Sequence, residues 1–175
     1  LFGLDPDEGL GFARVKAAAQ ELREALDACG LESVPMVTGG KGVHLVVPLR
    51  RVAGWDTVKF FARTFAQMFA ERHPERYTAT MSKAKREGRV FIDWLRNERG
   101  ATAIAPYSLR AREGAAIAVP LTWEAFGNVK RPDGFGVKDA EGFLTRPCPL
   151  ATAEKRGIGT GAVEALERLV EKGQG

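Results

Sequence analysis

The chain has 175 residues, 45% of them apolar, and carries a formal net charge of +4. This length and apolar content are enough for one domain with a buried core. No run approaches the ~20 apolar residues of a membrane-spanning helix, and the first residues lack a signal-peptide pattern, so we expect neither a membrane protein nor a secreted one.

The positive charge is concentrated between residues 81 and 112. This segment contains eight lysines or arginines and three acids, while the rest of the chain is slightly acidic. Such a concentration indicates a polyanionic partner, such as nucleic acid or a nucleoside triphosphate, or else a solvated basic face. Cys29 and Cys148 lie far apart without metal-ligand spacing, which predicts two buried free thiols in a reducing cytosol.

The first half of the chain alternates between strand and helix signals. Residues 1–6 predict a short strand, and its abrupt start predicts that upstream residues are missing. Apolar residues recur at helical spacing over residues 11–29, and Gly30 is the expected stop. Residues 33–38 and 43–49 predict two strands joined by a glycine-rich turn.

The middle of the chain continues this pattern. Residues 55–73 predict a second helix, which Pro74 ends. Residues 76–80 and 89–95 predict two further strands that flank a basic turn at residues 83–88.

The last third of the chain gives weaker signals. Residues 101–108 and 115–121 predict short strands, and residues 121–126 predict one or two helical turns. Residues 127–150 are rich in glycine and proline and predict a surface loop, whereas residues 160–173 predict an amphipathic helix. The whole pattern predicts a single α+β domain over residues 1–175.

Three residues bring unusual chemistry to the predicted strands. Asp5 shares a strand face with Gly3, because side chains two apart on a strand point the same way. His44 points away from the apolar set Val43, Leu45 and Val47. Asp93 interrupts an otherwise apolar strand, where a carboxylate needs a partner such as Mg²⁺ or Mn²⁺.

Each of these residues also has an ordinary structural interpretation. Taken alone, Asp5 is better explained as a turn acid or an N-cap before the first helix, and the ordinary explanation of Asp93 is an ion pair with a nearby arginine. His44 alone would be a packed, hydrogen-bonded histidine, and Lys41 a solvated turn lysine. The turn itself, GGKG, lacks the spacing of a Walker A loop and joins two strands, which excludes a P-loop ATPase.

Four segments, taken in order, closely resemble one family. They are FGLDP at residues 2–6, TGGKGVH at 38–44, FIDWLRN at 91–97 and APYSLRAR at 105–112. Together they resemble the polymerase domain of bacterial ligase D, a member of the archaeo-eukaryotic primase superfamily that acts in non-homologous end joining. The similarity runs continuously from residue 2 to about residue 126.

The resemblance implies an α+β fold with a mostly antiparallel central sheet flanked by helices, an RRM-like primase-polymerase core. It implies that Asp5 and Asp93 are catalytic residues that bind two divalent ions, Mn²⁺ or Mg²⁺. The reaction implied is the transfer of a nucleotidyl group from an NTP or dNTP to a DNA 3′-hydroxyl. Of these two substrates, the ribonucleotide is the expected one.

The resemblance and the basic turn together assign two further groups of residues. The expected nucleotide-binding residues are Thr38, Gly39, Gly40, Lys41, His44, Arg96, Arg110 and Arg112. The expected nucleic-acid-binding residues are Lys83, Lys85 and Arg86. Expected partners are DNA ends and primer-template DNA, a Ku-type end-binding protein, and ligase and nuclease domains, in a bacterial cytoplasm and associated with the nucleoid.

Two departures from the family pattern affect these expectations. The family's first metal-binding aspartate falls at Gly3, so we expect a poor or inactive polymerase unless Asp7 or Glu8 substitutes. The resemblance implies an N-terminal portion that supplies a 5′-phosphate pocket, and we expect this portion to be missing here. The alternatives are a catalytically degenerate nucleotide- or DNA-binding homologue, and an ordinary globular domain in which Asp93, His44 and Arg96 lie far apart.

Overall fold

The computed structural model describes residues 1–111 and 114–173. Its six-stranded sheet has the order β4-β5-β1-β3-β2-β6. The strands are β1 (Phe2–Pro6), β2 (Val34–Val37), β3 (Val43–Val46), β4 (Tyr77–Thr78), β5 (Val90–Asp93) and β6 (Val119–Pro120). All neighbouring pairs are antiparallel except β4 and β5, which are parallel. The predicted α+β fold is therefore confirmed, with a mixed sheet.

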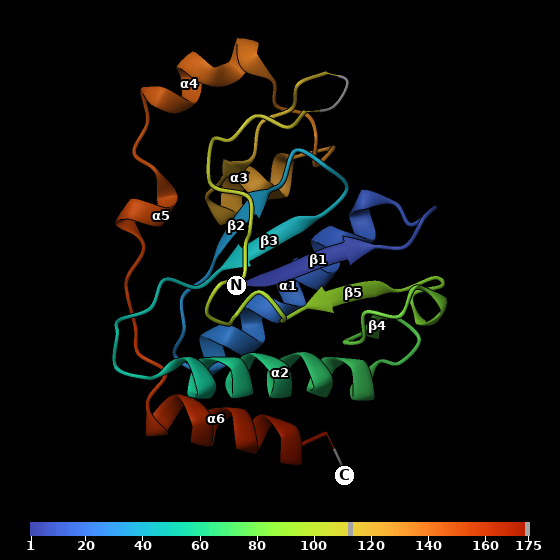
Figure 1. Cartoon of the computed structure of the whole chain (residues 1–175), viewed down its shortest axis with the longest axis vertical. Coiled ribbons are helices and arrows are strands. Elements are labelled where there is room, and N and C mark those ends of the chain that lie inside the picture. Colours follow the sequence, from blue (N-terminus) through green and yellow to red (C-terminus); the bar gives the residue numbers. More distant parts are fainter. Residues whose placement is uncertain (112–113, 174–175) are drawn as a thin grey trace.

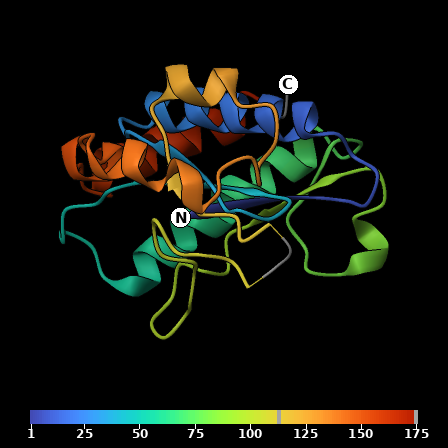
Figure 2. The same ribbon diagram turned by 90° about the horizontal axis from the view of Figure 1, so that it is seen from above.

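Helices pack against one face of this sheet and along the edge formed by β4. The α-helices are α1 (Phe12–Ala28), α2 (Trp55–Arg72), α3 (Trp123–Asn128), α4 (Ala140–Leu144), α5 (Pro149–Thr152) and α6 (Thr160–Glu171), with short 3₁₀ turns η1 (Lys83–Lys85) and η2 (Val137–Asp139). In Figure 1, β1 lies between β3 and β5, and α6 runs alongside α2. Figure 2 shows α1 (blue) and α3 (light orange) on one side of the sheet and the loop after β5 (olive) on the other.

The core lies between the sheet and the two long helices. In the strand register, Leu4 of β1 is paired with Val43 of β3 and with Ile92 of β5, and all three are fully buried. On the helix side, Phe65 of α2 packs its ring 5.0 Å from that of Phe2. Because side chains alternate along a strand, the neighbouring residues of these strands point away from the core.

The first helix ends where the sequence predicts. Gly30 has φ +70°, a left-handed conformation that a glycine adopts without steric penalty. Its N–H donates to the carbonyl of Asp27, and the N–H of Leu31 donates to that of Leu26. These bonds satisfy the last carbonyls of α1 and turn the chain towards β2.

Two sequence predictions are wrong in the last third of the chain. Residues 101–105 are irregular and residues 106–107 form a turn, where Pro106 has no N–H and Tyr107 adopts a left-handed φ of 64°, so residues 101–108 form no strand. The next residue, Leu109, forms an isolated antiparallel bridge with Ile117, and Tyr107 and Ser108 exchange backbone hydrogen bonds with Ala118. Residues 127–150 contain the end of α3, η2, α4 and the start of α5 in addition to loop.

Two smaller points concern the thiols and the membrane. Cys29 is buried as predicted, whereas Cys148 is only partly buried, and both are free. Among the described residues, no helix is both long and apolar enough to cross a bilayer.

We expect Phe65→Ala to lower the free energy of unfolding by about 3–5 kcal/mol, because it leaves a cavity between α2 and the sheet. Phe60→Ala is the matched control: it lies on the same helix with 61% of its surface exposed, so its effect should be within about 0.5 kcal/mol. Urea unfolding followed by circular dichroism measures both. Equal losses for the two variants would contradict this description of the core.

Candidate functional site

The sheet face opposite the long helices gathers three of the predicted side chains around Gly3. In the strand register, Gly3 is paired with His44 of β3 and with Asp93 of β5, and Asp5 follows two residues along the same strand. A Cβ atom placed on Gly3 would lie 3.2 Å from Asp93 Cβ, 3.7 Å from His44 Cδ2 and 3.8 Å from Asp5 Oδ2. The centre of this cluster is therefore a position without a side chain.

A cleft of about 690 Å³ opens over this cluster. Its lining includes Asp5, Thr38, Gly40, Lys41, Gly42, His44, Lys83, Arg86, Asp93, Arg96, Thr102, Ile104 and Arg110. Five cationic residues and two acidic ones thus line the cleft, which makes it suited to a polyanion. Because His44, Asp93 and Arg96 share one cleft, the alternative of an ordinary domain with these residues far apart is wrong.

Some predicted site residues lie elsewhere. Gly39 has φ +66° and lies under the side chain of Arg110, and its N–H donates to the carbonyl of Pro132. Lys85 is exposed in η1 and does not line the cleft. Arg112 lies outside the described residues.

The glycine turn between β2 and β3 forms one wall of the cleft. The hydroxyl of Thr38 donates to the carbonyl of Gly42 at 2.9 Å, so this group closes the turn. A Cβ on Gly42 would lie 2.6 Å from Asp5 Oδ1 and from the carbonyl oxygen of Leu4. Only glycine allows the turn to pack this closely on β1.

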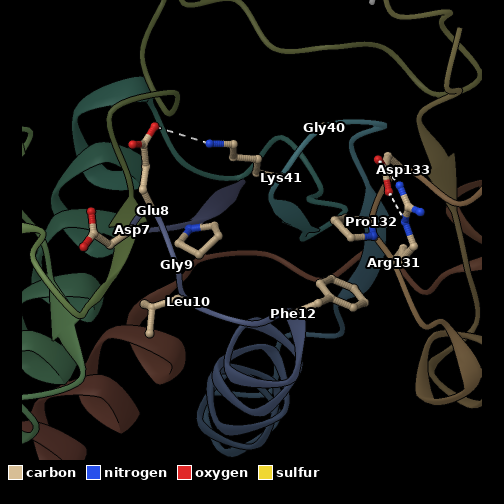
Figure 3. Close-up of a pocket in the computed structure, with 11 residues that line it drawn as sticks. Asp7, Glu8, Gly9, Leu10, Phe12, Gly40, Lys41, Arg131, Pro132 and Asp133 are labelled. Carbon is tan, nitrogen blue, oxygen red and sulfur yellow. Dashed lines mark hydrogen bonds and ion pairs between the residues drawn. The ribbon is translucent and has the colours of Figure 1, made fainter. Parts of the chain in front are cut away.

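Lys41 lies between the cleft and a second pocket of about 300 Å³. Figure 3 shows its ammonium group directed towards Glu8, with Nζ 3.5 Å from Oε1, while Leu10 and Phe12 lie on the opposite side of this pocket. Asp7 and Glu8 line the second pocket and not the cleft, and Asp7 Oδ2 accepts a hydrogen bond from the N–H of Gly88. Neither acid is therefore placed to substitute for the carboxylate absent at Gly3.

The carboxylate of Asp93 is already paired within the protein. Its Oδ1 accepts from the N–H of Leu95 at 2.9 Å, and its Oδ2 accepts from Arg96 Nε at 3.1 Å. Arg96 Nη1 also donates to the carbonyl of Thr102. The ordinary interpretation of Asp93, an ion pair with a nearby arginine, is thus what the structure contains.

Burial and neighbouring charges shift the pKa values of Asp5 and His44. Burial, reinforced by the charge of Asp93, raises the pKa of Asp5, while Arg86 and Arg96 act in the opposite direction. Burial lowers the pKa of His44 to about 4. The imidazole is therefore neutral at pH 7, and its buried Nδ1 has no hydrogen-bond partner among the described residues.

The residues present do not fit a two-metal centre. Among residues 1–111 and 114–173, no three histidine, cysteine or acidic side chains come together as a metal-binding group. Asp5 and Asp93 alone could share one hard cation if substrate phosphates supplied other ligands. A second ion would need the carboxylate that Gly3 lacks.

Sequence reasoning missed two features of the cleft. Arg86 stacks on the ring of Phe91 with its guanidinium carbon 4.0 Å from the ring centroid, and its Nη2 donates to the carbonyl of Met81. Thr102 and Ile104 line the wall formed by the loop after β5. The only sequence signal that this loop lines the cleft was its position between the motif segments at residues 91–97 and 105–112.

Comparisons with known proteins give a consistent result. The family model for the LigD primase-polymerase domain matches residues 1–148. The chain is 44% identical over 130 residues to the multifunctional non-homologous end joining protein LigD of Pseudomonas aeruginosa, covering 74% of this chain and 16% of that protein. It is 33% identical over 124 residues to the bifunctional LigD of Bacillus subtilis, covering 70% of this chain and 20% of that protein.

A solved structure extends the similarity to the fold. The polymerase domain of Mycobacterium tuberculosis ligase D in complex with DNA matches with a TM-score of 0.69 and 31% identity. The match covers 98% of this chain and 51% of that chain. The chain therefore spans about half of that structure, and only 16–20% of the length of the two curated relatives.

We expect His44 to titrate with a pKa of about 4 by NMR, with His73→Gln used to assign its resonance. Because the unfolded chain takes up this proton near pH ~6.5, His44 should lower stability as the pH falls from ~6.5 to ~4. The expected loss is about 3 kcal/mol relative to His44→Gln, measured by urea unfolding across this pH range. A midpoint near the ordinary histidine value would contradict this environment.

Proposed function

The chain belongs to the LigD primase-polymerase domain family, and we propose that its cleft binds a nucleoside triphosphate beside the 3′ end of a DNA break. Its curated relatives act in non-homologous end joining, and membership suggests a nucleotidyltransferase. The observation that carries the proposal is the cleft, in which Lys83, Arg86 and Arg110 join the glycine turn beside Asp5 and Asp93.

Each part of the cleft has a proposed role in holding these ligands. The triphosphate lies along the glycine turn, within reach of Lys41, His44 and the arginines, since guanidinium groups suit phosphate oxygens. Arg86 keeps its guanidinium in place by stacking on Phe91. The neutral imidazole of His44 offers a hydrogen bond without adding charge, and the resemblance implies that the nucleotide is a ribonucleotide.

DNA is the proposed second ligand. The related polymerase domain is in complex with DNA, and η1 places Lys83 at the cleft with Lys85 exposed nearby. We propose that these two lysines contact phosphates of the DNA backbone. Assembly with a Ku-type protein or with ligase and nuclease domains, and a location at the bacterial nucleoid, belong to the same proposal.

We further propose that this chain binds its ligands but transfers nucleotides slowly or not at all. Nucleotidyl transfer joins the 3′-hydroxyl oxygen to the α-phosphorus and releases pyrophosphate. The expected two ions do not fit the residues present, because Gly3 occupies the centre of the cluster and Asp7 and Glu8 line another pocket. The degenerate homologue is therefore favoured over a fully active polymerase.

Gly3→Asp tests this proposal. A Cβ at this position needs neighbours to shift by only a few tenths of an ångström, since its tightest contact is 3.2 Å from Asp93 Cβ. Because even an outer partner of a metal ligand is worth about 10–100-fold, we expect at least about 100-fold faster Mn²⁺-dependent ribonucleotide addition to a DNA primer. Gly3→Asn, equal in size but neutral, should not restore addition. Equal turnover by wild type and Gly3→Asp would contradict the proposal.

The DNA part is tested by the salt dependence of binding. We expect the double variant Lys83→Ala, Lys85→Ala to bind duplex DNA more weakly and to reduce the slope of log K against log [salt] by about 1–2. Lys138→Ala, Lys155→Ala, which removes two exposed lysines outside the cleft, is the matched control. Fluorescence anisotropy at several salt concentrations measures the slope, and equal slopes for the two double variants would remove η1 from the interface.

A further inference from the structure

We propose that the cleft binds the triphosphate directly through its cationic side chains, without a bridging divalent ion. This inference rests on the proposed function, since it concerns how the same cleft holds the same ligand. It reverses the role that the resemblance implies for Asp93, from a metal ligand to an anchor for Arg96.

The first argument is the state of the Asp93 carboxylate. Both of its oxygens accept hydrogen bonds, from the N–H of Leu95 and from Arg96 Nε, and the residue is only 7% exposed. A divalent ion at Oδ2 would have to share this oxygen with the positively charged guanidinium of Arg96, which is itself held by the carbonyl of Thr102. The guanidinium already supplies the positive charge that a buried carboxylate requires.

The second argument is the charge balance of the cleft. Lys83, Arg86 and Arg110 form no ion pair with a carboxylate within residues 1–111 and 114–173, although they line the cleft. With Gly3 in place of an acid, the carboxylates that remain are Asp5 and the paired Asp93. A bare triphosphate therefore meets more positive than negative charge and needs no ion to screen it.

The third argument comes from the central position itself. A carboxylate at residue 3 would crowd a third negative charge against Asp5 and Asp93, given the 3.8 Å and 3.2 Å contacts of its Cβ. Three carboxylates in that space would repel a triphosphate unless cations lay between them. The glycine removes both the ligand for the ions and the repulsion that makes the ions necessary.

The test measures ATP binding to the wild-type chain by isothermal titration calorimetry in EDTA, in Mg²⁺ and in Mn²⁺. Free ATP carries more negative charge than its Mg²⁺ complex, so the affinity in EDTA should equal or exceed that in Mg²⁺. An affinity that falls more than about threefold in EDTA would overturn the inference while leaving the proposed function intact. Absence of ATP binding in all three buffers would overturn both.

Two variants give predictions of opposite sign for the two binding modes. Asp93→Asn keeps an acceptor for Leu95 but removes a negative charge, so it should tighten ATP binding in EDTA by about threefold to tenfold. If Asp93 were a metal ligand, the same variant would weaken binding in Mn²⁺ instead. Gly3→Asp should make binding weaker in EDTA and stronger in Mn²⁺.

Asp133→Asn is the charge-matched control, because it removes one negative charge from an exposed ion pair with Arg131 outside the cleft. This variant should leave the affinity for ATP unchanged. If it tightened binding as much as Asp93→Asn does, the effect of Asp93→Asn would not be local to the cleft.

Discussion

The register of β1 between β3 and β5 is the constraint on which the site depends. Leu4 is locked between Val43 and Ile92 in the core, and this places Gly3 between His44 and Asp93 on the other face. A slip of one residue would exchange the two faces and bury a carboxylate in hydrocarbon, which is costly. The same apolar contacts that stabilise the sheet therefore also fix the polar cluster.

Electrostatics determines what this cluster can bind. Burial raises the pKa of Asp5 and lowers that of His44, so both shifts favour the uncharged form of the side chain. Asp93 is held in an ion pair with Arg96, whose Nε lies 3.1 Å from its Oδ2. The remaining arginines and lysines give the cleft an excess of positive charge, and this excess rather than a completed set of carboxylates is the dominant chemical property of the site.

Much of this arrangement was predictable because it follows from alternation along strands. The shared face of Gly3 and Asp5, and the outward direction of His44, follow from a period of two and from the apolar residues between them. The family resemblance supplied what alternation could not, namely that three distant strands meet. The comparisons confirm the family and the fold, whereas the roles of the individual site residues stay predictions.

The misses have physical causes. The strand predicted over residues 101–108 is absent, and its last part is replaced by a turn at Pro106 and the left-handed Tyr107. The positions of the Asp7 and Glu8 side chains depend on tertiary contacts with Gly88 and Lys41, which no local pattern encodes.

The close packing of Gly42 on Asp5 could not be predicted from the sequence either, yet it has a mechanical consequence. Because Gly42 leaves no room for a side chain between the turn and Asp5, a ligand that displaced the turn would also change the surroundings of this carboxylate.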